Sequence, residues 1–251
     1  MDKENTSHSE SANVADYHLI KIIGKGTYSS VYLGLDEKQT EVAVKAIQRP
    51  NFQKVDQHYI DQKMIFMNDA SVLDRIQGHP NIVKLIATIP QGTVMSPEGE
   101  PLDVDYAMVI ETLKGGELSY NLQKYGAFGA DLAHHYFKQI VGAIGHMHTK
   151  GIAHRDLKPW NVMLSNDLAD AKVIDFSYST PLDQAELKAI SAHYILKGFL
   201  PGTPQFMAPE QTVKDREPLV DDFSKIDVWA LAVMLVYMLT LRFPCSETAT
   251  E

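Results

Sequence analysis

The chain has 251 residues, of which 45% are hydrophobic and 22% charged, which argues against extended disorder away from its ends. Its 23 basic and 32 acidic residues give a net charge of −9, which argues against a surface that binds nucleic acid or an anionic membrane. The single cysteine, Cys245, excludes an internal disulfide, and the first fifteen residues lack the apolar core of a signal peptide. We therefore expect a cytoplasmic or nuclear protein with a disordered tail at residues 1–16 and with no nucleic-acid or membrane partner.

The first part of the chain is predicted to form strands at residues 17–35 and 41–48, because β-favouring residues dominate both segments. Gly24 and Gly26 open a loop between two of these strands, and their backbone amides could approach a triphosphate closely. Alone, such a glycine pair more often marks a tight turn. Lys45 lies within the later strand, where a solvated lysine would be the ordinary interpretation.

The next segments alternate in type. Apolar residues between Ile65 and Ile76 recur at spacings of three and four, which predicts a helix. Residues 88–105 are rich in proline and glycine and lack a helical period, so we expect a surface loop or hairpin there. A second helix is expected from Asp131 to a stop at Gly151, and the uncharged apolar run 228–241 is interpreted as a buried helix too short for a bilayer span.

Four chemically distinctive side chains lie in HRDLKPWN at 154–161 and VIDFS at 173–177: Asp156, Lys158, Asn161 and Asp175. Short apolar runs beside them predict two strands of a hairpin that holds the four groups on one floor. Phosphoryl transfer needs a carboxylate that orients and deprotonates a hydroxyl, a cation near the γ-phosphate, and hard oxygen ligands for Mg²⁺. The four residues supply these groups.

Seven motifs occur in a fixed order: GKGTYSSV at 24–31, VAVK at 42–45, GHPNIVKL at 78–85, HRDLKPWN, DFS, APE at 208–210 and DVW at 227–229. In this order they resemble the eukaryotic protein kinases over roughly residues 17–245. The resemblance implies an α+β, bilobal protein-kinase-like fold over residues 17–251. A strand-rich lobe at about 17–112 would be followed by a helical lobe at about 113–251 that is incomplete and lacks its last helices, with ATP between the two lobes.

The resemblance also implies a role for each matching residue. Asp156 would act as base, Lys158 would contact the γ-phosphate, Asn161 and Asp175 would bind Mg²⁺, and Lys45 would grip the α- and β-phosphates. Gly24 and Gly26 would cover the phosphates, with Ser29 in place of a third glycine. The residues implied around the adenosine are Ile23, Val31, Ala43 and Met163 against the adenine ring, the backbone of Glu111 and Leu113 bonded to it, and Glu117 near the ribose.

The largest departure from the family concerns the glutamate that pairs with the phosphate-gripping lysine. The sequence has no glutamate between Glu41 and Glu98, and counting back from GHPN puts Asp69 at the expected position. Its side chain is one methylene shorter, so the helix would lie about 1.5 Å closer, the length of one carbon–carbon bond. The alternative is a solvated Asp69 and a Lys45 without a helix partner.

Further positions bear on the kind of hydroxyl that accepts the phosphoryl group and on regulation of the activity. Thr203, in GTPQF, resembles the threonine that bonds Asp156 and Lys158 in serine/threonine kinases, which favours serine and threonine acceptors. Arg155 is of the type that pairs with a phosphate on the segment before APE, although Phe199 stands where a regulatory threonine is common. The hydroxyls near that position are Ser191, Tyr194 and Thr203.

Two functions are therefore weighed. The sequence predicts transfer of the γ-phosphoryl group of Mg·ATP to serine or threonine of a protein, because the catalytic set is intact. The alternative is a catalytically impaired pseudokinase that acts as a scaffold or allosteric module, which Asp69, DFS in place of DFG and the missing C-terminal helices favour. The chain is expected to be either a fragment or a short chain whose exposed apolar flank needs a regulatory partner.

Overall fold

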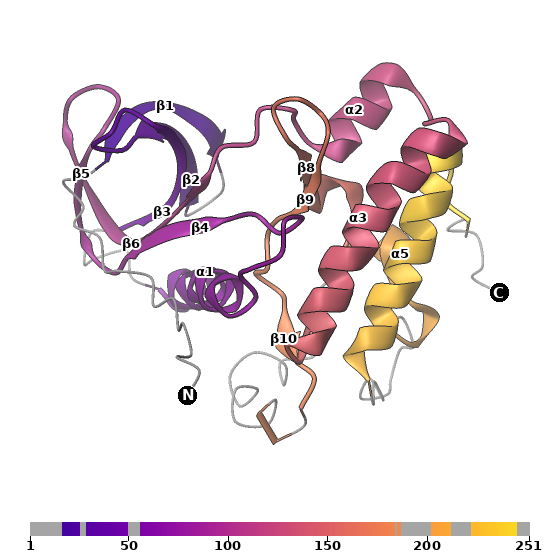
Figure 1. Ribbon diagram of the computed structural model, residues 1–251. Coiled ribbons are helices and arrows are strands. Elements are labelled where there is room, and N and C mark those ends of the chain that lie inside the picture. The colour runs from indigo at the N-terminus through magenta and orange to yellow at the C-terminus, as the bar shows by residue number, and fades with distance from the viewer. Residues whose placement is uncertain are drawn as a thin grey trace, which may run out of the picture. The chain divides into compact units, whose positions relative to one another are not determined.

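The computed structural model describes residues 17–25, 29–49, 56–183, 185–186, 202–211 and 222–244 (Figure 1). These residues form two compact units. The first contains the described residues up to Gln77 together with Val83–Thr112, and the second contains Gly78–Ile82 and the described residues from Leu113 onward. The strand-rich and helical units agree with the bilobal α+β class predicted from the sequence.

The short segment Gly78–Ile82 belongs to the second unit, although the sequence placed it in the first lobe. Its side-chain and backbone bonds explain the difference. The amide nitrogen of Asn81 donates to the carbonyl oxygen of Ala171 at 2.9 Å and to Gln139 at 3.1 Å, and Ile82 bridges to Val173. These contacts are between residues distant in sequence, so local patterns do not reveal them.

The first unit contains the strands β1 (His18–Lys25), β2 (Ser29–Leu35), β3 (Glu41–Gln48), β4 (Leu85–Ile89), β5 (Gly92–Met95) and β6 (Pro101–Glu111). They form one sheet in the order β3-β2-β1-β5-β6-β4, and β6 also pairs with β3. This extra pairing closes the sheet into a ring, visible as the curved strands in Figure 1. The ring encloses a core of alternating apolar residues that includes Leu19, Tyr32, Val44, Val94 and Val109.

The stretch that the sequence left as a loop or hairpin is a hairpin. Strands β5 and β6 pair antiparallel, and the turn between them is closed by a bond from the Ser96 N–H to the Glu100 carbonyl at 2.8 Å. The helix α1 (Gln57–Arg75) follows β3 in sequence and begins at Asp56, whose carboxylate accepts a bond from the Tyr59 N–H at 2.8 Å. Its buried residues include Phe66, Ala70 and Leu73.

The second unit contains α2 (Leu118–Tyr125), α3 (Ala130–Thr149), β7 (Ile152–Ala153), β8 (Val162–Leu164), β9 (Ala171–Val173), β10 (Thr180–Pro181) and α5 (Phe223–Thr240). Three 3₁₀ turns lie at Pro159–Asn161, Pro204–Phe206 and Pro209–Gln211. Strands β8 and β9 form the predicted antiparallel hairpin, and β7 pairs with β10. Helices α3 and α5 pack side by side (Figure 1).

Helix α5 is longer than the apolar run seen in the sequence, because it begins five residues earlier and includes Lys225 and Asp227. By length and composition alone it could cross a membrane, the only helix of the described residues that passes this test. A core helix passes the same test. Ile226, Ala230, Met234 and Met238 are buried, which is the pattern of a core helix.

Gly115 lets two backbone segments approach closely, so Gly115→Ala should lower the free energy of unfolding by about 1–3 kcal/mol. A Cβ atom there would lie 2.3 Å from the Ser165 carbonyl oxygen and 2.8 Å from Leu164, where the chain pairs with the end of β8. The matched control is Gly145→Ala on the exposed face of α3, where an added Cβ atom meets no other atom within 4 Å. This variant should raise the free energy of unfolding by at most about 1 kcal/mol. Urea unfolding of both variants measures the difference, and equal effects would contradict the close approach.

Candidate active site

Several residues that the family resemblance places around the nucleotide lie on one face of the sheet in the first unit. Val31 is directly opposite Lys45 on the neighbouring strand, and Ala43 lies two residues before Lys45, so the alternation of strands puts all three on the same face. Gly24 is paired with Val31. Ile23 stands at a register shift between β1 and β2 and is 51% exposed. Gly26 lies outside the described residues.

Lys45 is paired with Asp69. The Lys45 Nζ donates to Asp69 Oδ2 at 2.6 Å, and the Asp69 side chain is 1% exposed. The ring of Phe66 lies beneath the same ammonium group, 5.5 Å from it. The alternative of a solvated Asp69 is therefore excluded, and an aspartate takes the place of the glutamate that the family resemblance implies.

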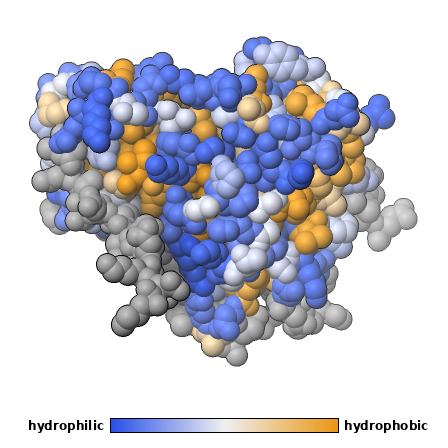
Figure 2. All heavy atoms as spheres, viewed as in Figure 1, coloured by the Kyte–Doolittle hydropathy of each residue, from blue (hydrophilic) through white to orange (hydrophobic). Residues whose placement is uncertain are grey.

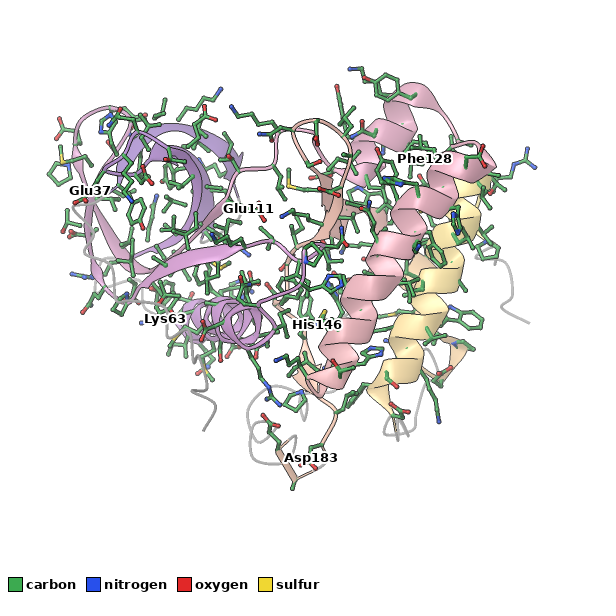
Figure 3. All side chains as sticks on the ribbon, viewed as in Figure 1. Glu37, Lys63, Glu111, Phe128, His146 and Asp183 are labelled. Carbon is green, nitrogen blue, oxygen red and sulfur yellow. The ribbon has the colours of Figure 1, made fainter. Side chains whose placement is uncertain are left out.

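Glu111 and Leu113, the expected adenine-binding segment, follow the end of β6. The Glu111 N–H donates to the Lys84 carbonyl at 3.1 Å, and its carboxylate accepts from the Lys84 N–H at 2.8 Å. The side chain, labelled in Figure 3, is thus held by the chain before β4. The backbone contact of Glu111 with adenine stays a prediction. Leu113 is half-buried and belongs to the second unit.

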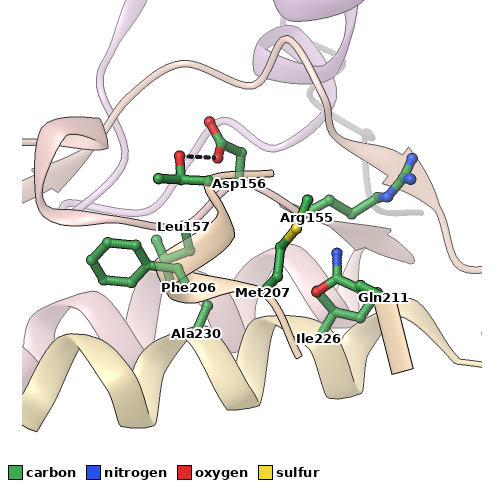
Figure 4. A pocket seen from close by; sticks show the side chains of 9 residues that line it. Arg155, Asp156, Leu157, Phe206, Met207, Gln211, Ile226 and Ala230 are labelled. Atoms are coloured by element: carbon green, nitrogen blue, oxygen red, sulfur yellow. Dashed lines mark hydrogen bonds between the residues drawn. The ribbon is translucent and has the colours of Figure 1, made fainter. Parts of the chain in front are cut away.

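The second unit brings together three polar side chains at and near residues 154–158, called the catalytic loop below because they include the expected base Asp156. Lys158 Nζ donates to Asp156 Oδ2 at 2.7 Å and to Thr203 Oγ1 at 2.8 Å, and the Thr203 hydroxyl donates to Asp156 Oδ1 at 3.1 Å. Figure 4 draws the last bond as a dashed line. This triangle fixes both carboxylate oxygens of Asp156. A carboxylate held in this way can orient a hydroxyl and accept its proton.

The two expected metal ligands have side chains oriented by their neighbours. The Asn161 amide nitrogen donates to the Asp156 carbonyl at 2.8 Å and to Asp156 Oδ2 at 3.2 Å, so only its oxygen can serve a cation. The Ser177 hydroxyl donates to Asp175 Oδ1 at 2.6 Å, and Asp175 itself adopts a left-handed backbone with φ of 60°. Amide and carboxylate oxygens are hard donors, so this pair fits Mg²⁺.

Glu117 and Met163 meet at a β-bridge between the start of α2 and strand β8. Met163 is half-buried, as expected for a residue beneath a flat ring, and Glu117 is exposed. The Ser119 hydroxyl donates to the Glu117 carboxylate at 2.8 Å. The site residues predicted for the second unit therefore lie close to one another, on the β8–β9 hairpin, beside it and in the loop that precedes β8.

Comparison with known proteins identifies the family. The protein kinase domain matches residues 17–251 of the chain. The chain belongs to the protein kinase family.

Its relatives include serine/threonine kinases. CBL-interacting serine/threonine-protein kinase 14 from Arabidopsis thaliana is 32% identical over 87% of this chain and 43% of its own length. CBL-interacting serine/threonine-protein kinase 20 from the same plant is 33% identical over 92% of this chain and 46% of its own. A probable cAMP-dependent protein kinase catalytic subunit from Encephalitozoon cuniculi is 30% identical over 95% and 64%. The chain thus spans less than two thirds of these relatives.

The kinase's catalytic loop is tethered by Asp227, a residue that the sequence singled out only as part of DVW. Asp227 is 0% exposed and accepts from the N–H groups of His154 and Arg155, both at 2.8 Å. His148 adds a third bond from its Nε2 to the same carboxylate at 2.8 Å. His148 lies in the last turn of α3, and its side chain is 21% exposed. No local pattern reveals the bond, because 79 residues separate its partners.

The pairing of Arg155 with a phosphate on the segment before APE stays a prediction, because residues 187–201 of that segment lie outside the described residues. Arg155 is 5% exposed, and its guanidinium lies 4.6 Å from the centre of the Phe223 ring. Burial lowers the pKa of Arg155 to about 10, partly opposed by the charge of Asp227. Its Nε has no hydrogen-bond partner among the described residues, and Arg155 is one of the residues that line a small cavity together with Met207 and Gln211 (Figure 4). The candidate acceptors Ser191 and Tyr194, and Phe199, lie outside the described residues.

Trp160, in HRDLKPWN, has a packing role. Its ring contacts Phe206 edge-on at 6.1 Å and Tyr237 of α5 at 6.4 Å, and Phe243 joins the same aromatic cluster. Phe206 follows Thr203 by one 3₁₀ turn. The cluster therefore helps to hold the turn that carries Thr203 beside Asp156.

Proposed function

We propose that this kinase domain transfers the γ-phosphoryl group of Mg·ATP to serine and threonine hydroxyls of protein substrates. The observation that carries the proposal is the triangle of Asp156, Lys158 and Thr203. Its threonine and lysine match the serine/threonine branch, and relatives of that type share about 30% identity with this chain.

The residues divide the reaction between them. Asp156 orients the acceptor hydroxyl and takes its proton, while Lys158 stays next to it and balances the charge that develops on the γ-phosphate. Lys45, held by Asp69, binds the α- and β-phosphates. Bound Mg²⁺ would neutralise charge on the phosphate oxygens, and Asn161 and Asp175 are the residues that would hold it.

The rival is a pseudokinase that binds nucleotide or partners without turnover. The serine of DFS favours it, because the Ser177 hydroxyl occupies Asp175 Oδ1. The complete set of Lys45, Asp156, Asn161 and Asp175 favours the enzyme. The deciding experiment measures γ-phosphate transfer by the purified protein to itself and to a serine/threonine peptide library. Incorporation that requires Asp156 supports the proposal, and nucleotide binding without incorporation supports the rival.

We further propose an intracellular setting, cytoplasmic or nuclear, with protein substrates and no nucleic-acid or membrane partner. A regulatory protein is proposed as an additional partner, because two relatives carry the name CBL-interacting kinases and because α5 is incompletely covered. Apolar side chains reach the surface of the helical unit in Figure 2. On and after α5 the exposed ones are Val228 at 60%, Leu239 at 40%, Leu241 at 37% and Val236 at 36%.

This exposed part of α5 should make the protein self-associate or unfold at a low temperature. Leu239 is exposed, whereas Trp229 and Leu235 of the same helix are half-buried. Val228→Lys combined with Leu239→Lys should therefore restore a monomer. The control is Leu132→Lys at an exposed position of α3, which should leave the oligomeric state and the melting temperature unchanged. Sedimentation velocity measures the oligomeric state, and a thermal melt measures the melting temperature. A monodisperse wild-type protein that melts as an ordinary domain would contradict the expectation.

A further inference from the structure

Strand β6 contains an extra residue where it pairs with β3, and that residue is Asp105. Ile47 is paired with Tyr106, but the next residue, Gln48, is paired with Val104, so Asp105 has no partner of its own in the ladder. Residues of a regular strand alternate between faces, which would direct Asp105 and Tyr106 to opposite sides. A bulge re-aims a side chain. Here it directs Asp105 toward α1, where Tyr106 also contacts the helix through Phe66.

Two residues of α1 bind the Asp105 carboxylate. The Tyr59 hydroxyl and the Lys63 Nζ both contact Asp105 Oδ2 at 2.6 Å, and the Asp105 side chain is 12% exposed. Figure 3 labels Lys63 on this helix. Burial raises the pKa of Asp105, but the hydrogen bonds from Lys63 and Tyr59 outweigh it and hold the pKa below its usual value. The carboxylate is therefore charged at neutral pH and attracts Lys63.

The Asp105 contact and the Asp69 contact fix the helix at two separate points. Tyr59 and Asp69 are ten residues apart, which is about 15 Å along a helix axis. Between them Phe66 packs edge-on against Tyr106, with ring centres 5.8 Å apart. A helix held at one end can still swing or roll at the other, whereas two points and a packed ring between them set both its tilt and its rotation.

We propose that Asp105 is a positioning residue for phosphoryl transfer: by binding Tyr59 and Lys63 it sets α1 so that the short Asp69 side chain reaches Lys45. The proposal rests on the proposed kinase function. An aspartate at position 69 reaches about 1.5 Å less far than a glutamate, so the helix has less tolerance for movement than a longer side chain would give it. The bulge at Asp105 supplies a second fixed point for this helix.

The test compares Asp105→Asn with Asp103→Asn. Asp103 lies on the same strand, and its carboxylate accepts a bond from the Thr93 hydroxyl of the neighbouring strand at 2.6 Å, so it is a control with the same change of charge away from α1. We expect kcat/KM for ATP to fall about tenfold in Asp105→Asn and to stay unchanged in Asp103→Asn. Lys63→Met should reproduce the loss, and Lys63→Arg should retain activity. Combining Asp105→Asn with Asp69→Asn should lose less than the product of the two single effects.

Hydrogen exchange supplies a readout that does not need turnover. If Asp105 positions the helix, Asp105→Asn should increase exchange at residues 66–73, next to Asp69, by about tenfold as well as at residues 59–63. Faster exchange confined to residues 59–63, or an Asp105→Asn variant that matches Asp103→Asn in both measurements, would overturn the proposal. A wild-type protein without transfer activity would reject the proposed function, while the exchange measurement would still decide the role of Asp105.

Discussion

Asp175→Asn should abolish Mg²⁺-dependent transfer, with a fall in kcat of about a thousandfold, and leave the fold intact. A metal ion contributes several kcal/mol to the stabilisation of a charged transition state, and each 1.4 kcal/mol corresponds to a factor of ten. The asparagine oxygen can still accept the bond that the Ser177 hydroxyl donates at 2.6 Å. The change therefore removes the charge of a ligand and not its packing.

The control for this variant is Asp170→Asn, the same chemical change at an exposed residue of the turn between β8 and β9. Steady-state transfer at several Mg²⁺ concentrations and a thermal melt should be measured for both. We expect equal melting temperatures for the two variants and a loss of transfer in Asp175→Asn alone. Wild-type turnover in Asp175→Asn would show that the metal assignment is wrong.

The sequence predicted the parts of this kinase domain that depend on motifs and on spacing. The β8–β9 hairpin and the helix with Asp69 follow from short patterns of apolar and turn residues, whereas the bonds of Thr203 to Asp156 and Lys158 were implied by the resemblance to serine/threonine kinases. Counting back from GHPN was sufficient for Asp69, because a helix fixes which residue faces a strand once its end is known.

The parts that the sequence did not predict depend on long-range contacts of buried polar groups. Asp227 and His148 lie on helices whose sequences predict only an apolar core face. Nothing in either helix indicates that the Asp227 carboxylate binds the catalytic loop. The bulge at Asp105 is similar, since strand register is decided by pairing with β3 and not by the β6 sequence. In each case a carboxylate on a helix or strand binds partners that are distant in the sequence, so only the tertiary structure reveals them.

Removing the charge of Asp69 should reduce transfer about a hundredfold. Asp69→Asn takes away the charge that holds Lys45 at 2.6 Å, and a misplacement of about 1 Å in a catalytic group costs about that factor. Asp69→Glu adds a methylene where the side chain is 1% exposed, so it should push α1 outward and lower transfer by a smaller amount, about tenfold. Asp74→Asn on the exposed side of the same helix should have no effect.

The pairing itself is tested by combining Asp69→Asn with Lys45→Met. Two members of one ion pair are not independent, so Lys45→Met should add little further loss to the Asp69 variant. Because the short carboxylate demands a closely placed helix, the active arrangement should also be less populated than a glutamate would allow and should respond more strongly to a regulator. Losses that multiply in the double variant, or an Asp69→Asn enzyme with full transfer, would show that Lys45 does not depend on Asp69. Asp61, half-buried on the same helix, would then be tested by the same double-variant comparison.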